Sequence, residues 1–361
     1  MLFQDKVISD SSLRIRSAAS LLKILRKSTL ILGSGMAENV MKRIFQPSLF
    51  VWLLGSVAVL GQTNASESNA PATANETNEV TPLTLPGAEP FVFQKVGETE
   101  LRLHVVKPKG WAATDSRPCL VTFFGGGWSS GTPAKSISYA KWAAKYGLVG
   151  VSPDYRTRKR FEGKPEDCVA DGRAAVRWIQ DHAKELGVDP GKIVVQGVSA
   201  GGHVAAWTAI PDPVTPQTAS DPMPSPGPAG LILLWPVTDT GTNGYGGPKR
   251  FGKDEARANN LSVTKRMPAK MPPTLVFHGT ADETVKFANS EEFQAKMKAN
   301  GNDCELIPFP DAPHSPQSSK EGEKGKAVRA KIAEESLKFL EKLGLVDKAE
   351  ANRLKPDQDT E

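Results

Sequence analysis

Short apolar runs alternate with amphipathic stretches between residues 89 and 345. Residues 91–96 and 101–106 show the two-residue alternation of an antiparallel strand pair, because Leu101, Leu103 and Val105 would share one face. Short, mostly apolar runs, which are typical of strands buried on both faces, follow at residues 119–124, 148–152, 193–196, 231–235, 274–278 and 306–309. Helical patterns occupy residues 137–146, 165–186, 290–299 and 327–343. Strands that alternate with helices of this length predict an α/β fold with a mostly parallel central sheet and helices on both faces.

Two segments interrupt this alternation. Residues 211–228 contain seven prolines, which exclude a helix or a central strand there. Residues 238–273 are polar and rich in glycine, and we expect them to be irregular. Loops over a sheet commonly carry substrate contacts, so we expect both segments to set specificity. Their large apolar residues are few, which predicts short acyl substrates rather than a lipid groove; in the second segment these are Tyr245, Phe251, Leu261, Val263, Met267 and Met271.

Residues 1–65 form a leader with its own composition. Its first 61 residues hold 8 Lys and Arg against 3 Asp and Glu, so the formal net charge of +5 lies entirely there. The rest of the chain is neutral, which argues against a nucleic-acid-binding protein. A basic pair, the apolar run at residues 49–60 and small residues after it predict a secretory signal within residues 41–65, and hence a secreted or periplasmic protein.

The apolar run of this leader is shorter than the roughly 20 residues that span a bilayer, so we expect no stable membrane span in the mature chain. An uncleaved anchor is the alternative. Met36 and Met41 are alternative starts of the chain. Residues 66–88 are polar and predict a flexible linker, residues 89–345 form the expected catalytic domain, and residues 346–361 form a polar tail.

The three cysteines, Cys119, Cys168 and Cys304, form no C-x-x-C pair, which excludes a zinc ribbon or a thioredoxin-type motif. Three buried free thiols are the interpretation we favour over a single disulfide. No bound metal and no cofactor are expected.

Residues 197–201, Gly-Val-Ser-Ala-Gly, fit the pattern G-x-S-x-G between a predicted strand and an apolar helix. A nucleophile at such a turn sits on strained backbone, and side chains at the flanking glycines would collide with neighbouring elements. The turn exposes the hydroxyl of Ser199 at a helix N-terminus, where developing negative charge is favoured. Ser199 is therefore the candidate nucleophile.

A serine hydroxyl needs a base, and the chain has five histidines: His104, His182, His203, His278 and His314. The first four fall in strands or helices, where histidines commonly pack or support other groups. His314 lies in a loop after the last apolar strand, where the geometry requires the base.

The base needs an acid that fixes its tautomer. Asp282 follows the run at residues 274–278, and the chain order Ser, Asp, His is the one expected of this arrangement. Glu283 and Asp311 are the rival acids.

Phe124-Gly125-Gly126-Gly127-Trp128 follows an apolar strand. Glycines allow backbone N–H groups to approach a ligand closely, so Gly126, Gly127 and Ala200 are the candidate oxyanion hole. The loop is not a phosphate loop, because no Gly-Lys-Ser/Thr follows it.

These motifs resemble those of the α/β-hydrolase superfamily. The likeness is to its esterase branches with a Gly-Gly-Gly-Trp loop and a Ser-Ala-Gly-Gly-His elbow, namely hormone-sensitive-lipase-like enzymes and secreted carbohydrate esterases such as acetyl xylan and feruloyl esterases. It covers residues 91–343 and implies that Asp154, Tyr155 and Arg156 are structural supports. Many relatives have histidine where this chain has Phe124, which leaves any orienting side-chain hydrogen bond there in question.

The motifs and the resemblance together predict a secreted serine carboxylic-ester hydrolase that forms an acyl-enzyme and acts on short acyl esters, with acylated carbohydrates as a candidate class. The expected partner is a small-molecule or carbohydrate ester. The alternatives are an amidase or peptidase on the same scaffold and a non-catalytic binding relative.

Overall fold

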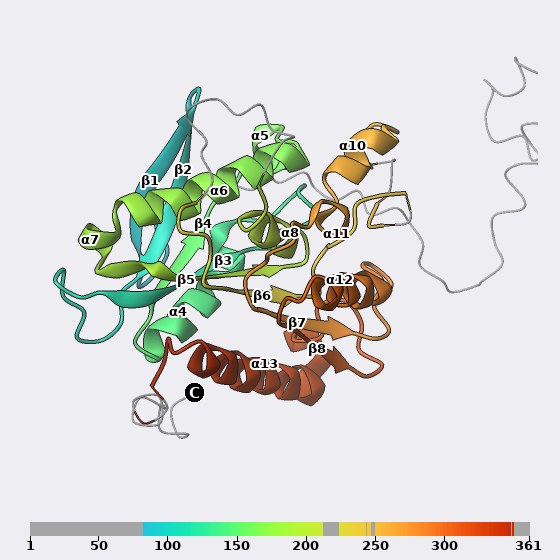
Figure 1. Cartoon of the computed structure of the whole chain (residues 1–361). Coiled ribbons are helices and arrows are strands. Elements are labelled where there is room, and N and C mark those ends of the chain that lie inside the picture. The colour runs from blue at the N-terminus through green and yellow to red at the C-terminus, as the bar shows by residue number, and fades with distance from the viewer. Residues whose placement is uncertain (1–81, 212–223, 243, 247–249, 348, 350–361) are drawn as a thin grey trace, which may run out of the picture. The chain divides into compact units, whose positions relative to one another are not determined.

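One eight-stranded sheet organises the part of the chain that the structure describes (Figure 1). The computed structural model describes residues 82–211, 224–242, 244–246, 250–347 and 349. The secretory signal expected within residues 41–65 and the alternative starts at Met36 and Met41 lie outside these residues. So do most of the linker and the tail expected at residues 66–88 and 346–361.

The strands follow the order β1-β2-β4-β3-β5-β6-β7-β8. β1 (Glu89–Val96) and β2 (Thr99–Val106) form the antiparallel pair, and β2 also runs antiparallel to β4 (Val149–Pro153). All other neighbours are parallel, and they comprise β3 (Arg117–Phe123), β5 (Val188–Val198), β6 (Gly230–Leu234), β7 (Thr274–Gly279) and β8 (Cys304–Phe309). The mostly parallel sheet expected from the sequence is confirmed.

Helices cover both faces of the sheet (Figure 1). α4 (Ile137–Lys145) and α13 (Gly322–Lys342) pack on one face. The other face carries α6 (Pro165–Asp181), α7 (Ala183–Leu186), α8 (Ala200–Trp207) and α12 (Ala288–Ala299). Shorter elements connect them: η1 (Pro133–Lys135), α5 (Arg158–Phe161), α10 (Glu255–Asn260), α11 (Val263–Arg266) and η2 (Ser319–Glu321).

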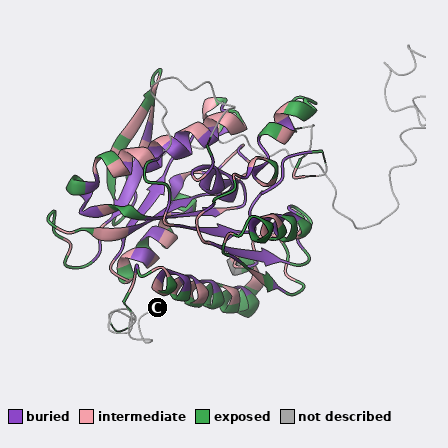
Figure 2. Ribbon diagram, in the orientation of Figure 1, coloured by how far each residue is buried: buried purple, intermediate pink, exposed green. Residues whose placement is uncertain are grey.

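The central strands are buried on both faces (Figure 2). In β3, Cys119, Val121 and Phe123 belong to the core beneath α6 and α8, whereas Leu120 belongs to the core beneath α4 and α13. Successive side chains of a strand point to opposite faces, so an uninterrupted apolar run supplies both cores at once. The carboxyl ends of β3, β5, β6 and β7 lie in this order along one edge of the parallel part of the sheet, and the candidate site lies there.

The bounds of several elements differ from expectation. The helix expected at residues 165–186 is interrupted at His182, and α13 begins at Gly322 rather than near residue 327. Residues 238–273 are not irregular throughout, because they contain α10 and α11. The side chains of Asp254 and Ser262 accept hydrogen bonds from N–H groups in the first turns of these helices. These two N-cap residues are the features of the sequence from which the starts of α10 and α11 can be predicted.

No helix among the described residues is long and apolar enough to cross a membrane.

Candidate active site

Ser199 occupies the sharp turn between β5 and α8, with φ 54° and ψ −118°. A methyl group at Gly197 would lie 2.1 Å from the carbonyl oxygen of Gly201, and one at Gly201 would lie 2.2 Å from that of Phe124. Both glycines are therefore required by close backbone approach, as the sequence predicts. The N–H of Ser199 donates to the carbonyl oxygen of Leu234 at 2.9 Å, which ties the turn to β6.

The structure brings Ser199, His314 and Asp282 into one hydrogen-bonded chain. His314 Nε2 lies 3.0 Å from Ser199 Oγ, and His314 Nδ1 lies 2.6 Å from Asp282 Oδ2. His314 lies on the loop between β8 and α13, and Asp282 follows β7. The rival acids Glu283 and Asp311 are exposed to solvent.

Four hydrogen bonds hold the carboxylate of Asp282. Its Oδ1 accepts the backbone N–H groups of Thr284 and Val285, each at 2.8 Å. Its Oδ2 is shared by His314 and by His278, whose Nε2 lies 3.1 Å away. Burial alone raises the pKa of Asp282, but the hydrogen bonds from His278, His314 and Val285 outweigh burial and hold the pKa well below its usual range. The carboxylate is therefore ionised at neutral pH.

His278 is a member of this network that sequence reasoning treated as a packing or supporting histidine. The signal was its place at the end of the strand that precedes Asp282, four residues before the acid.

The glycine-rich loop after β3 lies against the nucleophile. A methyl group at Gly125 would lie 3.2 Å from Ser199 Cβ, and one at Gly126 would lie 2.0 Å from the carbonyl oxygen of Ser130. Gly126 and Gly127 have φ of 144° and 60°, a region that L side chains rarely adopt. Within the described residues, the N–H groups of Gly126, Gly127 and Ala200 have no protein acceptor.

Tyr155 holds the start of this loop. Its hydroxyl donates to the carbonyl oxygen of Phe124 at 2.7 Å, and the two rings stack with centroids 4.1 Å apart. The carbonyl oxygen of Trp128 accepts the N–H of Arg158 at 2.9 Å, which fixes the other end of the loop. A side-chain hydrogen bond therefore does reach the loop, but it comes from Tyr155 rather than from position 124.

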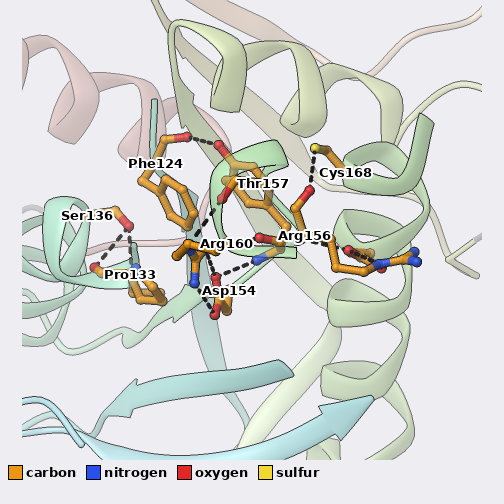
Figure 3. Close-up of polar contacts among 11 residues, drawn as sticks. Phe124, Pro133, Ser136, Asp154, Arg156, Thr157, Arg160 and Cys168 are labelled. Atoms are coloured by element: carbon orange, nitrogen blue, oxygen red, sulfur yellow. Dashed lines mark hydrogen bonds and ion pairs between the residues drawn. The ribbon is translucent and has the colours of Figure 1, made fainter. Parts of the chain in front are cut away.

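Ion pairs hold the residues on either side of Tyr155 (Figure 3). Asp154 pairs with Arg160, whose side chain is 1% exposed, and Arg156 pairs with Asp171 at 2.7 Å. The thiol of Cys168 donates to the carbonyl oxygen of Arg156 at 3.1 Å. The structure thus gives Asp154, Tyr155 and Arg156 the supporting contacts that the resemblance implied. All three cysteines of the chain are buried and unpaired.

Trp128 anchors the loop in the core beside α8. Its buried indole ring packs edge-on against His203 at 5.0 Å and near Tyr245 and Phe251 at 5.8 and 6.1 Å. Burial lowers the pKa of His203 to about 4, so this histidine is neutral. Phe251 and Leu261, which lie in a segment expected to set specificity, are each 1% exposed and belong to the core.

A cavity of about 950 Å³ includes Ser199 and His314 in its lining. Tyr139 and Trp142 of α4 and Ile332 of α13 form other parts of its wall. Burial raises the pKa of Tyr139 to about 12, so its phenol is neutral. No cluster of metal-ligating side chains occurs among the described residues.

Known proteins show similar sequences and structures. The BD-FAE family model matches residues 103–216, which include the glycine-rich loop and the Ser199 turn. An esterase of Thermogutta terrifontis is 38% identical, and its structure covers 73% of this chain and 95% of its own with a TM-score of 0.66. The same protein phosphorylated by paraoxon is 38% identical, covers 72% of this chain and 96% of its own, and has a TM-score of 0.65.

Carboxylesterase NlhH of Mycobacterium tuberculosis is 36% identical over 115 residues, which are 31% of this chain and 34% of NlhH. The chain spans between a third and a half of the length of the first three curated relatives it matches, but nearly all of the Thermogutta esterase. From the shared sheet and this near-complete match, the chain belongs to the serine carboxylesterases of the α/β-hydrolase superfamily.

Proposed function

We propose that Ser199, His314 and Asp282 form the catalytic triad of a carboxylesterase that acts on short acyl esters. The observation that carries this proposal is the 3.0 Å approach of His314 Nε2 to Ser199 Oγ while Nδ1 contacts the ionised Asp282. The carboxylate accepts the Nδ1 proton, which leaves the lone pair of Nε2 directed at the serine hydroxyl.

In the first step, Ser199 Oγ attacks the ester carbonyl carbon and His314 Nε2 takes the hydroxyl proton. The carbonyl oxygen becomes an oxyanion, which accepts hydrogen bonds from the N–H groups of Gly126, Gly127 and Ala200. When the C–O bond to the alcohol breaks, His314 returns the proton to the leaving oxygen and the acyl group remains on Ser199. Water then attacks the acyl-enzyme by the same route, and the carboxylic acid leaves.

The acyl group is expected to be small, from acetyl to butyryl. The large apolar residues Phe251, Leu261 and Val263 are buried in the core, so they are not available to line a groove for a long chain. The Thermogutta esterase supports this range, because its structures include complexes with propionate and butyrate.

The alcohol part is proposed to be a sugar, in a protein exported through the signal within residues 41–65. Two observations support an acylated carbohydrate. The family model that matches residues 103–216 is that of bifunctional feruloyl and acetyl xylan esterases. The cavity wall also combines the aromatic rings of Tyr139 and Trp142 with polar residues such as Gln317 and Ser336.

The test is ester hydrolysis by the wild type and by Ser199→Ala. We expect Ser199→Ala to lower kcat for p-nitrophenyl acetate by about 10⁴-fold or more, because the nucleophile of a triad is lost. Ser318→Ala is the matched control and should retain wild-type kcat. Ser318 lies on the same loop as His314, and its hydroxyl accepts a hydrogen bond from the backbone N–H of Lys320. Retention of a tenth of the activity in Ser199→Ala would refute the triad.

The substrate class is tested with a panel. We expect kcat/KM to be highest from acetyl to butyryl, to fall beyond, and to be high for acetylated xylosides. The matching p-nitroanilide should be cleaved far more slowly; comparable rates would favour an amidase. An increase in kcat/KM that continues to decanoyl would contradict the short-acyl proposal, because each added methylene would have to find apolar surface.

A further inference from the structure

A second histidine contacts the carboxylate of the proposed triad. His278, the fifth residue of β7, is fully buried, and its Nε2 lies 3.1 Å from Asp282 Oδ2 and 2.8 Å from the carbonyl oxygen of Val285. Its Nδ1 lies 2.7 Å from Oγ of Ser290, a fully buried residue of α12. Both ring nitrogens are thus engaged at the base of the site.

These contacts fix the tautomer of His278. The carbonyl oxygen of Val285 can only accept, so Nε2 carries a proton and shares it between that oxygen and Asp282 Oδ2. The hydroxyl of Ser290 can donate to the lone pair of Nδ1. A neutral imidazole therefore satisfies every partner, and His278 donates a hydrogen bond to the same carboxylate oxygen that faces His314.

We propose that His278 is a positioning residue for ester hydrolysis, an inference that rests on the triad of the proposed function. Two backbone N–H groups hold Oδ1 of Asp282, and His278 holds Oδ2, so the carboxylate cannot rotate away from His314. The N–H of His278 also withdraws negative charge from Oδ2. It thereby weakens the attraction between Asp282 and an imidazolium at His314.

We assign this effect of His278 to its contact with Asp282, because the other charged side chains that flank the imidazole are exposed to solvent. Phe287 lies edge-on to the imidazole at 5.7 Å, and Asp282 is the titratable side chain hydrogen-bonded to it among the described residues. The charged side chains that flank it on the loop after β7, on α12, on β8 and on the loop after β8 are exposed to solvent: Glu283, Lys286, Glu291, Glu305 and Asp311.

The test is the pH profile of kcat/KM for p-nitrophenyl acetate. His278→Leu removes the N–H, so the acid limb should move to higher pH by about half a unit or more, with a lower kcat. His278→Gln can place an amide N–H near the position of Nε2, so its acid limb should stay near that of the wild type. Ser290→Ala removes the hydroxyl partner of Nδ1, which helps to orient the imidazole, and should cause a smaller shift in the same direction.

His104→Leu is the matched control. His104 is a fully buried histidine of β2 whose ring nitrogens have no partner among the described residues, and it has no contact with Asp282. Like His278→Leu, this variant removes a buried imidazole, but it should leave the acid limb unchanged.

An unshifted acid limb in His278→Leu, or an equal shift in His278→Leu and His278→Gln, would overturn the inference. If His278→Leu does not fold, the pH profile of Ser290→Ala is the deciding measurement. An unshifted acid limb in Ser290→Ala would then overturn the inference. Either failure would leave the triad intact, whereas activity that survives Ser199→Ala would refute the proposed function itself.

Discussion

The nucleophile half and the acid–base half of the site are built in different ways. Ser199 and the loop residues Gly125 and Gly126 are positioned by backbone in close contact with backbone, at positions where a methyl group would collide. Asp282 and His314 are positioned by side-chain hydrogen bonds, with His278 as a third member. Gly279 also allows the loop before His314 to approach β7, but the orientation of the reacting groups there rests on side chains.

This difference determines how each half responds to change. Added volume disrupts the nucleophile half because packed backbone cannot yield by a few tenths of an ångström without moving a strand or a helix. In the acid–base half, a lost donor alters the charge on a carboxylate oxygen and leaves the backbone in place. Substitutions should therefore be steric in effect around Ser199 and electrostatic around Asp282.

The largest effect is expected for Gly201→Ala. The new methyl group would lie 2.2 Å from the carbonyl oxygen of Phe124 and 2.4 Å from that of Phe123, so α8 must move away from the end of β3. We expect at least a 100-fold loss of kcat and a loss of stability at the upper end of the about 1–3 kcal/mol that overpacking costs. Urea unfolding and ester hydrolysis measure the two effects.

Gly227→Ala is the control for this prediction, because nothing lies within 4 Å of the added methyl group. It should fold and hydrolyse esters as the wild type does. Wild-type kcat in Gly201→Ala would show that the nucleophile half tolerates added volume, and the steric side of the comparison would be wrong.

A second expected effect is a loss of stability in mild acid that originates in the nucleophile half. Burial lowers the pKa of His203 to about 4 from about 6.5. Between these values the unfolded chain binds the proton and the folded chain does not, so the free energy of unfolding falls as the pH falls, by about 3 kcal/mol in total. The pKa of Asp282 is depressed, so its contribution is lost only at still lower pH.

Urea unfolding at pH 7.5, 5.5 and 4.5 measures this slope for the wild type and for His203→Gln, which has no imidazole to titrate. We expect a flatter dependence in His203→Gln, whatever its absolute stability. Parallel slopes in the two proteins would assign the acid sensitivity to another group, with His104 the next candidate because burial lowers its pKa as well.

The two halves also differ in how far the sequence predicts them. Gly197, Ser199 and Gly201 lie within five residues, and the constraint on them is local backbone geometry, so the pattern is visible in the chain. Asp282 and His314 follow strands, and their positions could be inferred because parallel strands share one carboxyl edge. The sheet itself could be inferred because burial on both faces requires strands that are mostly apolar.

The supporting contacts could not be predicted in the same way. Tyr155 and Phe124 are 31 positions apart, and the hydrogen bond between them follows no periodicity in the sequence. His278 and Ser290 meet only because α12 packs against the end of β7. The polar, glycine-rich character of residues 238–273 predicts an irregular segment that sets specificity, yet tertiary packing places its Phe251 in the core beside Trp128.

The smallest effect is expected for Tyr155→Phe, which separates support from sterics within the nucleophile half. The change keeps the ring stacked on Phe124 but removes the hydroxyl that donates to the Phe124 carbonyl oxygen at 2.7 Å. A neutral hydrogen bond contributes about 1 kcal/mol, so stability should fall by about that amount and kcat by a few-fold, with KM nearly unchanged.

Tyr146→Phe, at the end of α4 where the ring packs on Trp142, is the control. If Tyr155→Phe lost as much kcat as Gly201→Ala, the loop would depend on a side-chain hydrogen bond as strongly as the acid–base half does. Because backbone contacts at Gly125 and Gly126 persist in this variant, we expect the loop to hold its place and the loss to stay small.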